Sequence, residues 1–265
     1  MQLNKENYHS IEANKQYMSV SQFKSFLLQY NGCEAKTMAK LNREWEDGDN
    51  PAFLLGSYVH AWNEGVLPEF IANNPGLFKK DGTLYAKYAI GDEMINTLKN
   101  DEVAMAALEG QKEVIITEEL FGMPFKIMID SYNPEKEAFT DLKTCREINK
   151  TYWNELTRER ENFIIHWGYD VQVAVYSEIE LRYRKGKDYY MPHILAVSKE
   201  DPPDKELIMF GRNFIPDLLD QLEVFAPRVY EVWQGKAEPR RCGTCDYCRS
   251  TKKLKEAIYY IEVGL

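Results

Sequence analysis

Three short strand-like runs near the middle of the sequence constrain the fold more than any other feature. They cover residues 113–119 (EVIITEE), 123–130 (MPFKIMID) and 137–144 (EAFTDLKT), and turn-forming residues separate them. Runs of β-branched and aromatic residues with such short connections predict a β-meander. The centre of the chain is therefore expected to form a sheet.

Helical periodicity surrounds this meander. Apolar residues recur at helical spacing in three segments before it, residues 18–41, 51–64 and 84–108. In the first segment Ser19 or Ser21 is the expected N-cap and Asn31-Gly32 an interruption, and residues 66–83 have the pattern of a loop. After the meander the pattern predicts helices over 150–160, 165–184 and 216–233, and strands over 188–198 and 206–212. This order predicts an α/β fold whose mixed central sheet is flanked by helices.

The length of the chain favours one large domain. Its 265 residues are 44% hydrophobic, which is enough for one sizeable core. We expect a single domain over residues 1–265. It would consist of a helical N-terminal part (18–110), a sheet core (111–212) and a C-terminal helix followed by cysteines (213–265).

The net charge argues against binding by overall attraction. With 33 Lys and Arg against 42 Asp and Glu, the formal charge is -9, which disfavours proteins that hold nucleic acid or anionic membranes by bulk charge. Any polyanion must be held by a local group of cations. No apolar run approaches the ~20 residues of a membrane-spanning helix, and the N-terminus is polar. These features predict a soluble, cytoplasmic protein without membrane contact.

Two carboxylates and a lysine fall at the ends of neighbouring predicted strands. Alternation places Asp130 off the apolar stripe of the second strand, and Asp141 and Lys143 are two apart on one face of the third. Carboxylates held this close need a cation between them. Oxygen ligands suit Mg²⁺ or Mn²⁺, and Lys143 would then orient water or stabilise phosphate charge. The alternative is a turn cap and a solvated strand edge.

Three further polar residues lie on predicted helices. His60 lies in AFLLGSYVHAWNEG, and Gln172 and Tyr176 are four residues apart on one face of YDVQVAVYSEIELRY. Gln172 and Tyr176 would reach a DNA phosphate or base. Taken singly, the histidine is more often packed or exposed than a ligand, and the pair is more often helix surface.

Together these residues resemble the PD-(D/E)xK nuclease superfamily, in its RecB-like and RecE-like branch of phage or prophage exonucleases. Four elements occur in the order of that family: GSYVH, IMID, DLK and QVAVY. The resemblance implies that His60, Asp130, Asp141 and the backbone carbonyl of Leu142 bind the metal, and that Lys143 is the catalytic lysine. Gln172 and Tyr176 would support the site. Glu113 is either an additional acidic neighbour or a surface carboxylate at a strand end.

The resemblance also implies an activity and partners. The activity is Mg²⁺- or Mn²⁺-dependent hydrolysis of DNA from the ends of linear duplexes, in phage recombination, by a homo-oligomer that works with a single-strand annealing protein. One alternative is a single-strand-directed nuclease like those of CRISPR adaptation. The others are a catalytically inactive module that binds DNA or a partner, and a structural phage protein.

Three of the five cysteines form a C-x-x-C-x-x-C motif at Cys242, Cys245 and Cys248. Thiolates at this spacing converge on one metal centre, and a fourth ligand must come from elsewhere. In some RecB-like nucleases a cysteine at the position of Cys33 supplies a ligand of a [4Fe-4S] cluster, so the resemblance implies a metal site that joins the N- and C-terminal segments. Tetrahedral Zn²⁺ is the alternative. Cys145 has no partner motif and is expected to be a small buried hydrophobe.

Local groups of cations and aromatic residues are candidates for DNA contact. The cations follow the D-x-K strand or end predicted helices: Lys143, Arg146, Lys150, Arg158, Arg160, Arg182, Arg184, Lys185 and Lys187. Charges at helix ends are more often a solvated face that complements the helix dipole. The aromatic candidates for base stacking are Tyr58, Trp62, Tyr152 and Trp153.

Overall fold

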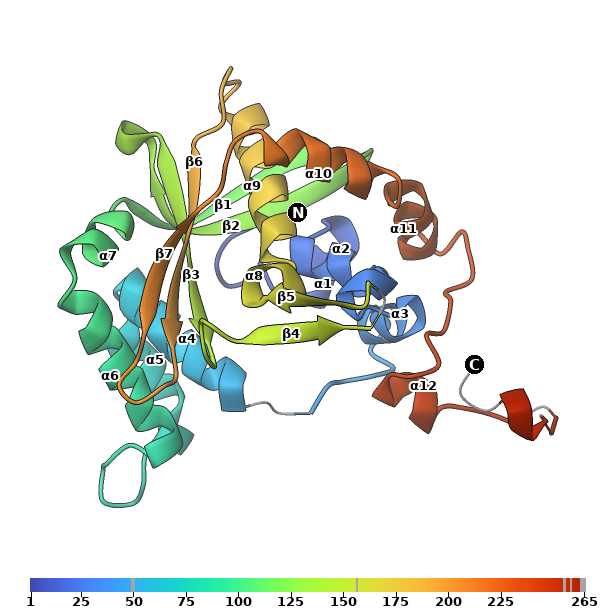
Figure 1. Ribbon diagram of the computed structural model, residues 1–265, viewed down its shortest axis with the longest axis horizontal. Helices are drawn as coiled ribbons and strands as arrows, with labels where there is room; N and C mark the ends of the chain where they lie inside the picture. The colour runs from blue at the N-terminus through green and yellow to red at the C-terminus, as the bar shows by residue number, and fades with distance from the viewer. Residues whose placement is uncertain (49–50, 156, 255, 258, 263–265) are drawn as a thin grey trace.

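The central sheet has five strands in the order β1-β2-β3-β6-β7 (Figure 1). The computed structural model describes residues 1–48, 51–155, 157–254, 256–257 and 259–262. Neighbouring strands are antiparallel except β3 and β6, which are parallel, so the predicted mixed sheet is confirmed. The strands are β1 (Gln111–Leu120), β2 (Met123–Asn133), β3 (Ala138–Cys145), β6 (Met191–Ser198) and β7 (Lys205–Met209).

Helices cover both faces of this sheet. The larger core lies between the sheet and four helices, α2 (Val20–Phe26), α9 (Tyr169–Tyr183), α10 (Phe214–Glu223) and α11 (Ala226–Trp233). A second core joins Leu142 and Leu195 to α4 (Pro51–Glu64) and α6 (Ala86–Lys99). None of the described helices is long and apolar enough to cross a membrane. The remaining helices are α1 (Ile11–Gln16), η1 (Leu28–Tyr30), α3 (Glu34–Leu41), α5 (Leu67–Asn73), η2 (Pro75–Leu77), α7 (Glu102–Ala107), η3 (Pro134–Lys136), α8 (Phe163–His166), α12 (Asp246–Ser250) and η4 (Tyr260–Glu262).

The first predicted helical segment is divided where the sequence indicates. The Ser19 hydroxyl caps α2 by accepting from the Gln22 N–H, 3.2 Å away. Asn31 then takes a left-handed backbone conformation, with φ of 57°. A Cβ on Gly32 would lie 2.6 Å from the carbonyl oxygen of Leu27, so only glycine fits this turn. The turn places Cys33 directly before α3.

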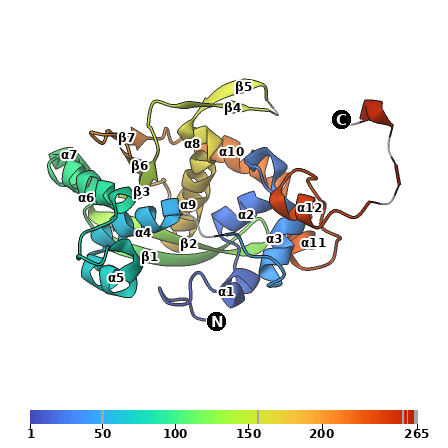
Figure 2. The same cartoon turned by 90° about the horizontal axis from the view of Figure 1, so that it is seen from below.

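The predicted helix over residues 150–160 is wrong. This segment is a separate hairpin of β4 (Thr151–Asn154) and β5 (Glu159–Asn162), which stands beyond α8 (Figure 2). Thr151, Tyr152 and Trp153 are β-branched or aromatic, and alternate burial of this short run overrides its weak helical period. Arg158, with φ of 57°, ends the turn between the strands.

Other differences concern where elements begin and end. The predicted helix over 165–184 is divided at Gly168, which has φ of 60°. The predicted helix over 216–233 restarts at Ala226 because Pro227 cannot donate a helical hydrogen bond, so it lies in a first turn. The predicted loop over 66–83 contains α5 and η2.

Two of the cations at the end of α9 form ion pairs with glutamates of the same helix. Arg184 Nε lies 2.8 Å from Glu180 Oε1, whose side chain is fully buried and also accepts from the Tyr132 hydroxyl. Arg182 pairs with Glu178 at 2.6 Å. These arginines lie about 15–18 Å along the helix from Gln172. These ion pairs stabilise the fold, and contact of the arginines with DNA stays a prediction.

The Arg184–Glu180 pair is more deeply buried than the Arg182–Glu178 pair, so the two arginine mutations should differ in their cost to stability. Arg184→Ala leaves the Glu180 carboxylate buried without its cation, so we expect the free energy of unfolding to fall by about 3–5 kcal/mol. Arg182→Ala removes a pair at the surface and should cost less than about 1 kcal/mol. Urea denaturation measures both, and equal costs would contradict the assignment.

Candidate functional site

Three carboxylates lie in one row across neighbouring strands. The β1–β2 register pairs Lys112 with Ser131 and Val114 with Ile129, so Glu113 lies opposite Asp130. The β2–β3 register pairs Ser131 with Thr140, and its continuation places Asp130 opposite Asp141. Backbone pairing between β2 and β3 ends one step before this row. The strands therefore separate where the carboxylates lie.

The alternation of faces is interrupted at the same row. Ile127 and Ile129 pack in the core under α9, yet Tyr132, three residues later, also hydrogen-bonds Glu180 of α9 at 2.8 Å. Glu113 has φ of 54°, an uncommon conformation for a residue other than glycine, which costs on the order of 1–3 kcal/mol. Because of this local distortion, the side chains of Glu113 and Asp130 do not follow the regular alternation between the two faces of the sheet.

Helix α4 brings His60 to this row. His60 Nδ1 lies 3.5 Å from Asp130 Oδ2. One turn later Asn63 accepts from the Lys112 ammonium at 2.7 Å, and its amide lies 3.3 Å from Ser131 Oγ. A Cβ on Gly56 would lie 3.3 Å from Thr144 Oγ1, so the glycine of GSYVH lets α4 approach β3.

His60, Glu113 and Asp130 form a group with the composition of a metal site. One ligand atom from each lies within 4.8 Å of the others. Burial and the Asp130 charge raise the pKa of Glu113 to about 7. Burial opposes ionisation of Asp130, but His60 and Lys143 hold its pKa below the usual value. A divalent cation fits this donor set, because it would offset the charge of carboxylates that burial has taken out of water.

Asp141 and Lys143 form a second group beside the first. Lys143 Nζ lies 2.7 Å from Asp141 Oδ2, and Gln172 Nε2 donates to Asp141 Oδ1 at 2.5 Å. The ammonium lies 4.8 Å from the ring centre of Tyr169. Burial disfavours the charged lysine, but Asp141 and Tyr169 raise its pKa above the usual value. Lys143 is therefore held as a cation facing Asp141.

Leu142 and Tyr176 lie at the edge of these groups. The Leu142 N–H donates to Asp130 Oδ2 at 2.7 Å. Since the N–H and C=O of a strand residue point to the same side, the carbonyl faces the same gap between β2 and β3. Tyr176 is buried one turn after Gln172, and burial raises its pKa well above the usual value. No hydrogen bond joins the described Tyr176 side chain to a carboxylate of the row.

Sequence reasoning missed three side chains around the site. Asn63 lies three residues after His60, and Tyr169 three before Gln172, so helical spacing would have found both. Tyr8 is buried next to Glu113 and Asp130, and burial together with these charges raises its pKa. Its segment has no periodic pattern, so no local signal identifies it.

Two of the four aromatic candidates belong to the fold. Tyr58 is buried and donates to Asp92 at 2.7 Å. Trp62 packs under the Lys99 ammonium, 5.8 Å from the ring centre. Tyr152 and Trp153 instead lie on the β4–β5 hairpin, where Trp153 is exposed.

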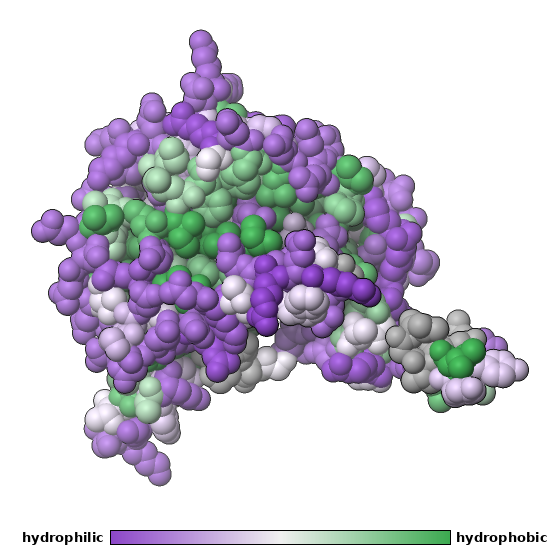
Figure 3. All heavy atoms as spheres, in the orientation of Figure 1, coloured by the Kyte–Doolittle hydropathy of each residue, from purple (hydrophilic) through white to green (hydrophobic). Residues whose placement is uncertain are grey.

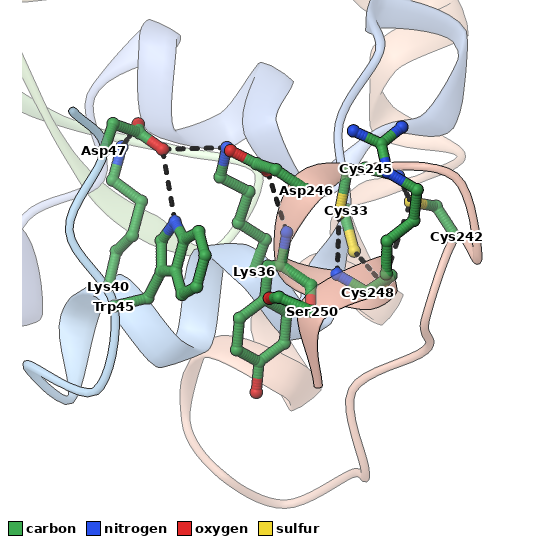
Figure 4. A network of polar contacts seen from close by, with 12 residues as sticks. Cys33, Lys36, Lys40, Trp45, Asp47, Cys242, Cys245, Asp246, Cys248 and Ser250 are labelled. Atoms are coloured by element: carbon green, nitrogen blue, oxygen red, sulfur yellow. Dashed lines mark hydrogen bonds and ion pairs between the residues drawn. The ribbon is translucent and has the colours of Figure 1, made fainter. Parts of the chain in front are cut away.

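The four predicted cysteine ligands meet, as Figure 4 shows. Cys33 Sγ lies 3.5 Å from Cys248 Sγ, and Cys242 Sγ lies 3.9 Å from Cys248 Sγ. Burial would raise the pKa of Cys242, but donors from Cys245 and Thr244 lower it to about 6. Cys145 is buried in β3 apart from this group, as expected.

Charged side chains fasten α3 to α12 beside the cysteines. Lys36 Nζ lies 2.8 Å from Asp246 and 2.7 Å from Asp47 (Figure 4). Trp45 donates to Asp47 at 3.3 Å and packs edge-on against Tyr247. The N-terminal and C-terminal segments are therefore joined by ion pairs beside the contact between the Cys33 and Cys248 thiols.

Comparison with known proteins identifies the family. The model of the PDDEXK-like domain of unknown function (DUF3799) matches residues 19–251. The chain belongs to this PDDEXK-like family. A crystal structure of a candidate exonuclease from Eubacterium rectale is 40% identical, with a TM-score of 0.92, and the match covers 100% of this chain and 98% of that one. The family and this neighbour support a nuclease.

A second solved structure is only weakly similar to this chain. The crystal structure of SSO0001 is 15% identical with a TM-score of 0.30, covering 81% of this chain and 91% of that one. No curated protein matches the chain.

The row of carboxylates predicts which residues control divalent metal binding. Glu113→Gln keeps the shape of the side chain but removes a charge from the His60 group, so Mn²⁺ affinity should fall about tenfold or more. Glu119→Gln, in the same strand but exposed, is the control and should bind as the wild type does. Isothermal titration measures both, and unchanged affinity in Glu113→Gln would remove this residue from the site.

Proposed function

We propose that the chain is a single nuclease domain that hydrolyses DNA phosphodiester bonds with Mg²⁺ or Mn²⁺. The row of Glu113, Asp130 and Asp141, with Lys143 at its end, carries this proposal. His60, Asp130, Asp141 and the Leu142 carbonyl would hold the metal, as the resemblance implies, and Glu113 would join them. The bound ion would activate water and neutralise charge on the phosphate.

The side chains around the row would orient the carboxylates and stabilise charge on the phosphate. Gln172 holds one oxygen of Asp141, which fixes the carboxylate in one orientation. Asp141 and Tyr169 keep the Lys143 ammonium charged, so it can stabilise negative charge on a phosphate oxygen. Tyr8 and Tyr176 are buried, and the charge of Asp130 helps to raise the pKa of each hydroxyl, so both would pack close to the row. Tyr176 therefore supports the site through packing.

A nuclease-like domain implies DNA as the substrate, and the Eubacterium rectale neighbour is named an exonuclease. An overall charge of -9 requires local cations. One local group lies around the cysteines, where residues 240–253 contain five Arg and Lys against one acidic residue. That residue, Asp246, is already paired with Lys36. This region can contact the phosphate backbone.

The resemblance to RecE-like enzymes refines the proposal. Digestion would begin at the ends of linear duplex DNA during phage recombination. A single-strand annealing protein and further copies of this chain would be its partners. A CRISPR-adaptation-like nuclease and an inactive binding module are distinguished by the experiment below.

Incubation of end-labelled linear DNA with Mg²⁺ tests this function. Wild-type protein should release mononucleotides from duplex ends. Lys143→Ala removes the cation beside Asp141 and should lower the rate about 100- to 1000-fold. Lys79→Ala, which removes an exposed lysine, is the control.

Three other outcomes of this incubation would contradict the proposal or favour an alternative. Full activity of Lys143→Ala would reject the assignment. Cleavage of single strands alone would favour the CRISPR-adaptation-like alternative. Absence of cleavage by a protein that binds Mn²⁺ would favour the inactive module.

For the cysteine site we propose Zn²⁺ in preference to a [4Fe-4S] cluster. Tetrahedral Zn²⁺ with Zn–S bonds of about 2.3 Å places its sulfurs about 3.8 Å apart. The distances of 3.5 and 3.9 Å between sulfurs agree with that spacing. A cluster binds each thiolate to a different iron, so its sulfurs stand farther apart.

Metal analysis of purified protein tests this choice. We expect about one zinc per chain and a colourless protein. Cys33→Ser should lose the metal and unfold at lower temperature, whereas Cys145→Ser should retain it. Iron with absorption near ~400 nm would contradict zinc and support the cluster.

A further inference from the structure

In the sequence, the β4–β5 hairpin lies between β3, which carries Lys143, and α9, which carries Gln172. It follows β3 directly and leads through α8 into α9. It forms no part of the central sheet, and Figure 2 shows it on the outside of the molecule, beyond α8. A two-stranded hairpin alone is marginally stable in water. Contacts with α8 must therefore hold it in place.

Aromatic rings make those contacts. Tyr152 stacks on His166, with ring centres 4.3 Å apart and planes 11° from parallel. Trp167 meets Tyr152 edge-on at 5.9 Å. Glu161 accepts from Asn154 at 2.6 Å and lies 3.7 Å from His166. The inner face of the hairpin is thereby fixed on α8.

A second pair of rings lies between α8 and the candidate active site. Trp167 is two residues before Tyr169, whose ring lies beneath Lys143. Lys24 Nζ donates to the carbonyls of Trp167 at 2.7 Å and Gly168 at 2.9 Å, which holds this turn in place. Phe163 packs edge-on against Tyr169. Tyr169 beside Lys143 and Tyr152 of the hairpin therefore pack against the same hydrophobic cluster, which contains Phe163.

Two tryptophans of this region are half-exposed, and strand alternation directs Trp153 to the outer face of the hairpin while Trp167 lies beside Tyr152 on the inner face. Trp153 is 49% exposed and Trp167 50%, and Ile165 between them in the sequence is 42% exposed. Arg160 lies directly across from Trp153 in the hairpin register. Lys150 lies 5.4 Å above the Tyr152 ring. At the place of the hairpin, Figure 3 shows strongly hydrophilic residues next to pale ones of intermediate hydropathy.

The charge of the hairpin indicates which form of DNA would bind. Residues 146–162 contain four cations and four acidic residues, so attraction of phosphates alone is weak. Stacking on aromatic rings supplies about 1–3 kcal/mol per base, but it requires bases whose faces are free. A duplex hides those faces. The combination of exposed tryptophans with balanced charge therefore favours an unpaired strand.

We propose that the β4–β5 hairpin and α8 bind single-stranded DNA, with bases stacked on Trp153 and Trp167 and the strand leading toward Lys143. This inference rests on the proposed function, since it names the form of the DNA strand next to that site. A linear duplex would accordingly have to be opened at its end before the strand reaches the carboxylates.

Binding of labelled oligo(dT) without added divalent metal tests the proposal independently of cleavage. Trp153→Ala and Trp167→Ala should each weaken binding about tenfold. Trp153→Phe keeps an aromatic ring and should retain most of the affinity. Tyr183→Ala, which removes an exposed ring at the far end of α9, is the control and should bind as the wild type does.

Two further measurements separate this proposal from the function of the metal site. Blunt duplex DNA should bind equally to wild type and to both alanine variants. Hydrolysis of bis(p-nitrophenyl) phosphate, which has no base to stack, should remain unchanged in those variants. Failure of this hydrolysis in the wild type would count against the proposed nuclease activity alone.

The oligo(dT) result decides the proposal. Wild-type affinity in the double variant Trp153→Ala/Trp167→Ala would overturn it, and so would an equal loss of duplex binding. A loss with Trp153→Phe as large as with alanine would contradict stacking. Circular dichroism of each variant confirms that the fold is retained.

Discussion

Repulsion among buried carboxylates is the constraint on which the rest of this structure depends. Glu113, Asp130 and Asp141 lie in one row across three strands, where burial removes the water that would screen them. Lys143 offsets one charge, and His60 partly offsets another. Lys143 comes from β3 itself, whereas helices on the two faces of the sheet supply His60 from α4 and the Gln172 amide, which donates to Asp141, from α9.

Much of this site could be predicted because its signals are local. Asp141 and Lys143 share a face through the period of a strand, and His60 lies on a helix that the sequence marks with Pro51. The cysteine motif predicts convergence at short spacing, and the family resemblance supplies Cys33. The structure brings together the residues that these patterns name.

The other features of the fold and the site depend on contacts between distant parts of the chain, which a local sequence pattern does not predict. Glu113 enters the row because its backbone takes a left-handed conformation, which alternation does not anticipate. Tyr8 comes from a non-periodic segment more than 100 residues away from the strands that it contacts. The β4–β5 segment was predicted as a helix, because the alternate burial that distinguishes it as a hairpin comes from packing on α8, as in the stacking of Tyr152 on His166. Tertiary contacts decide each of these cases.

The central claim is that one divalent cation binds between His60, Glu113 and Asp130. Anomalous diffraction from a crystal soaked in Mn²⁺ tests it most directly, because it locates the metal itself. The account predicts one peak within coordination distance, about 2.0–2.6 Å, of a ligand atom from each of these residues. Absence of a peak there, with Mn²⁺ bound elsewhere or not at all, would contradict it.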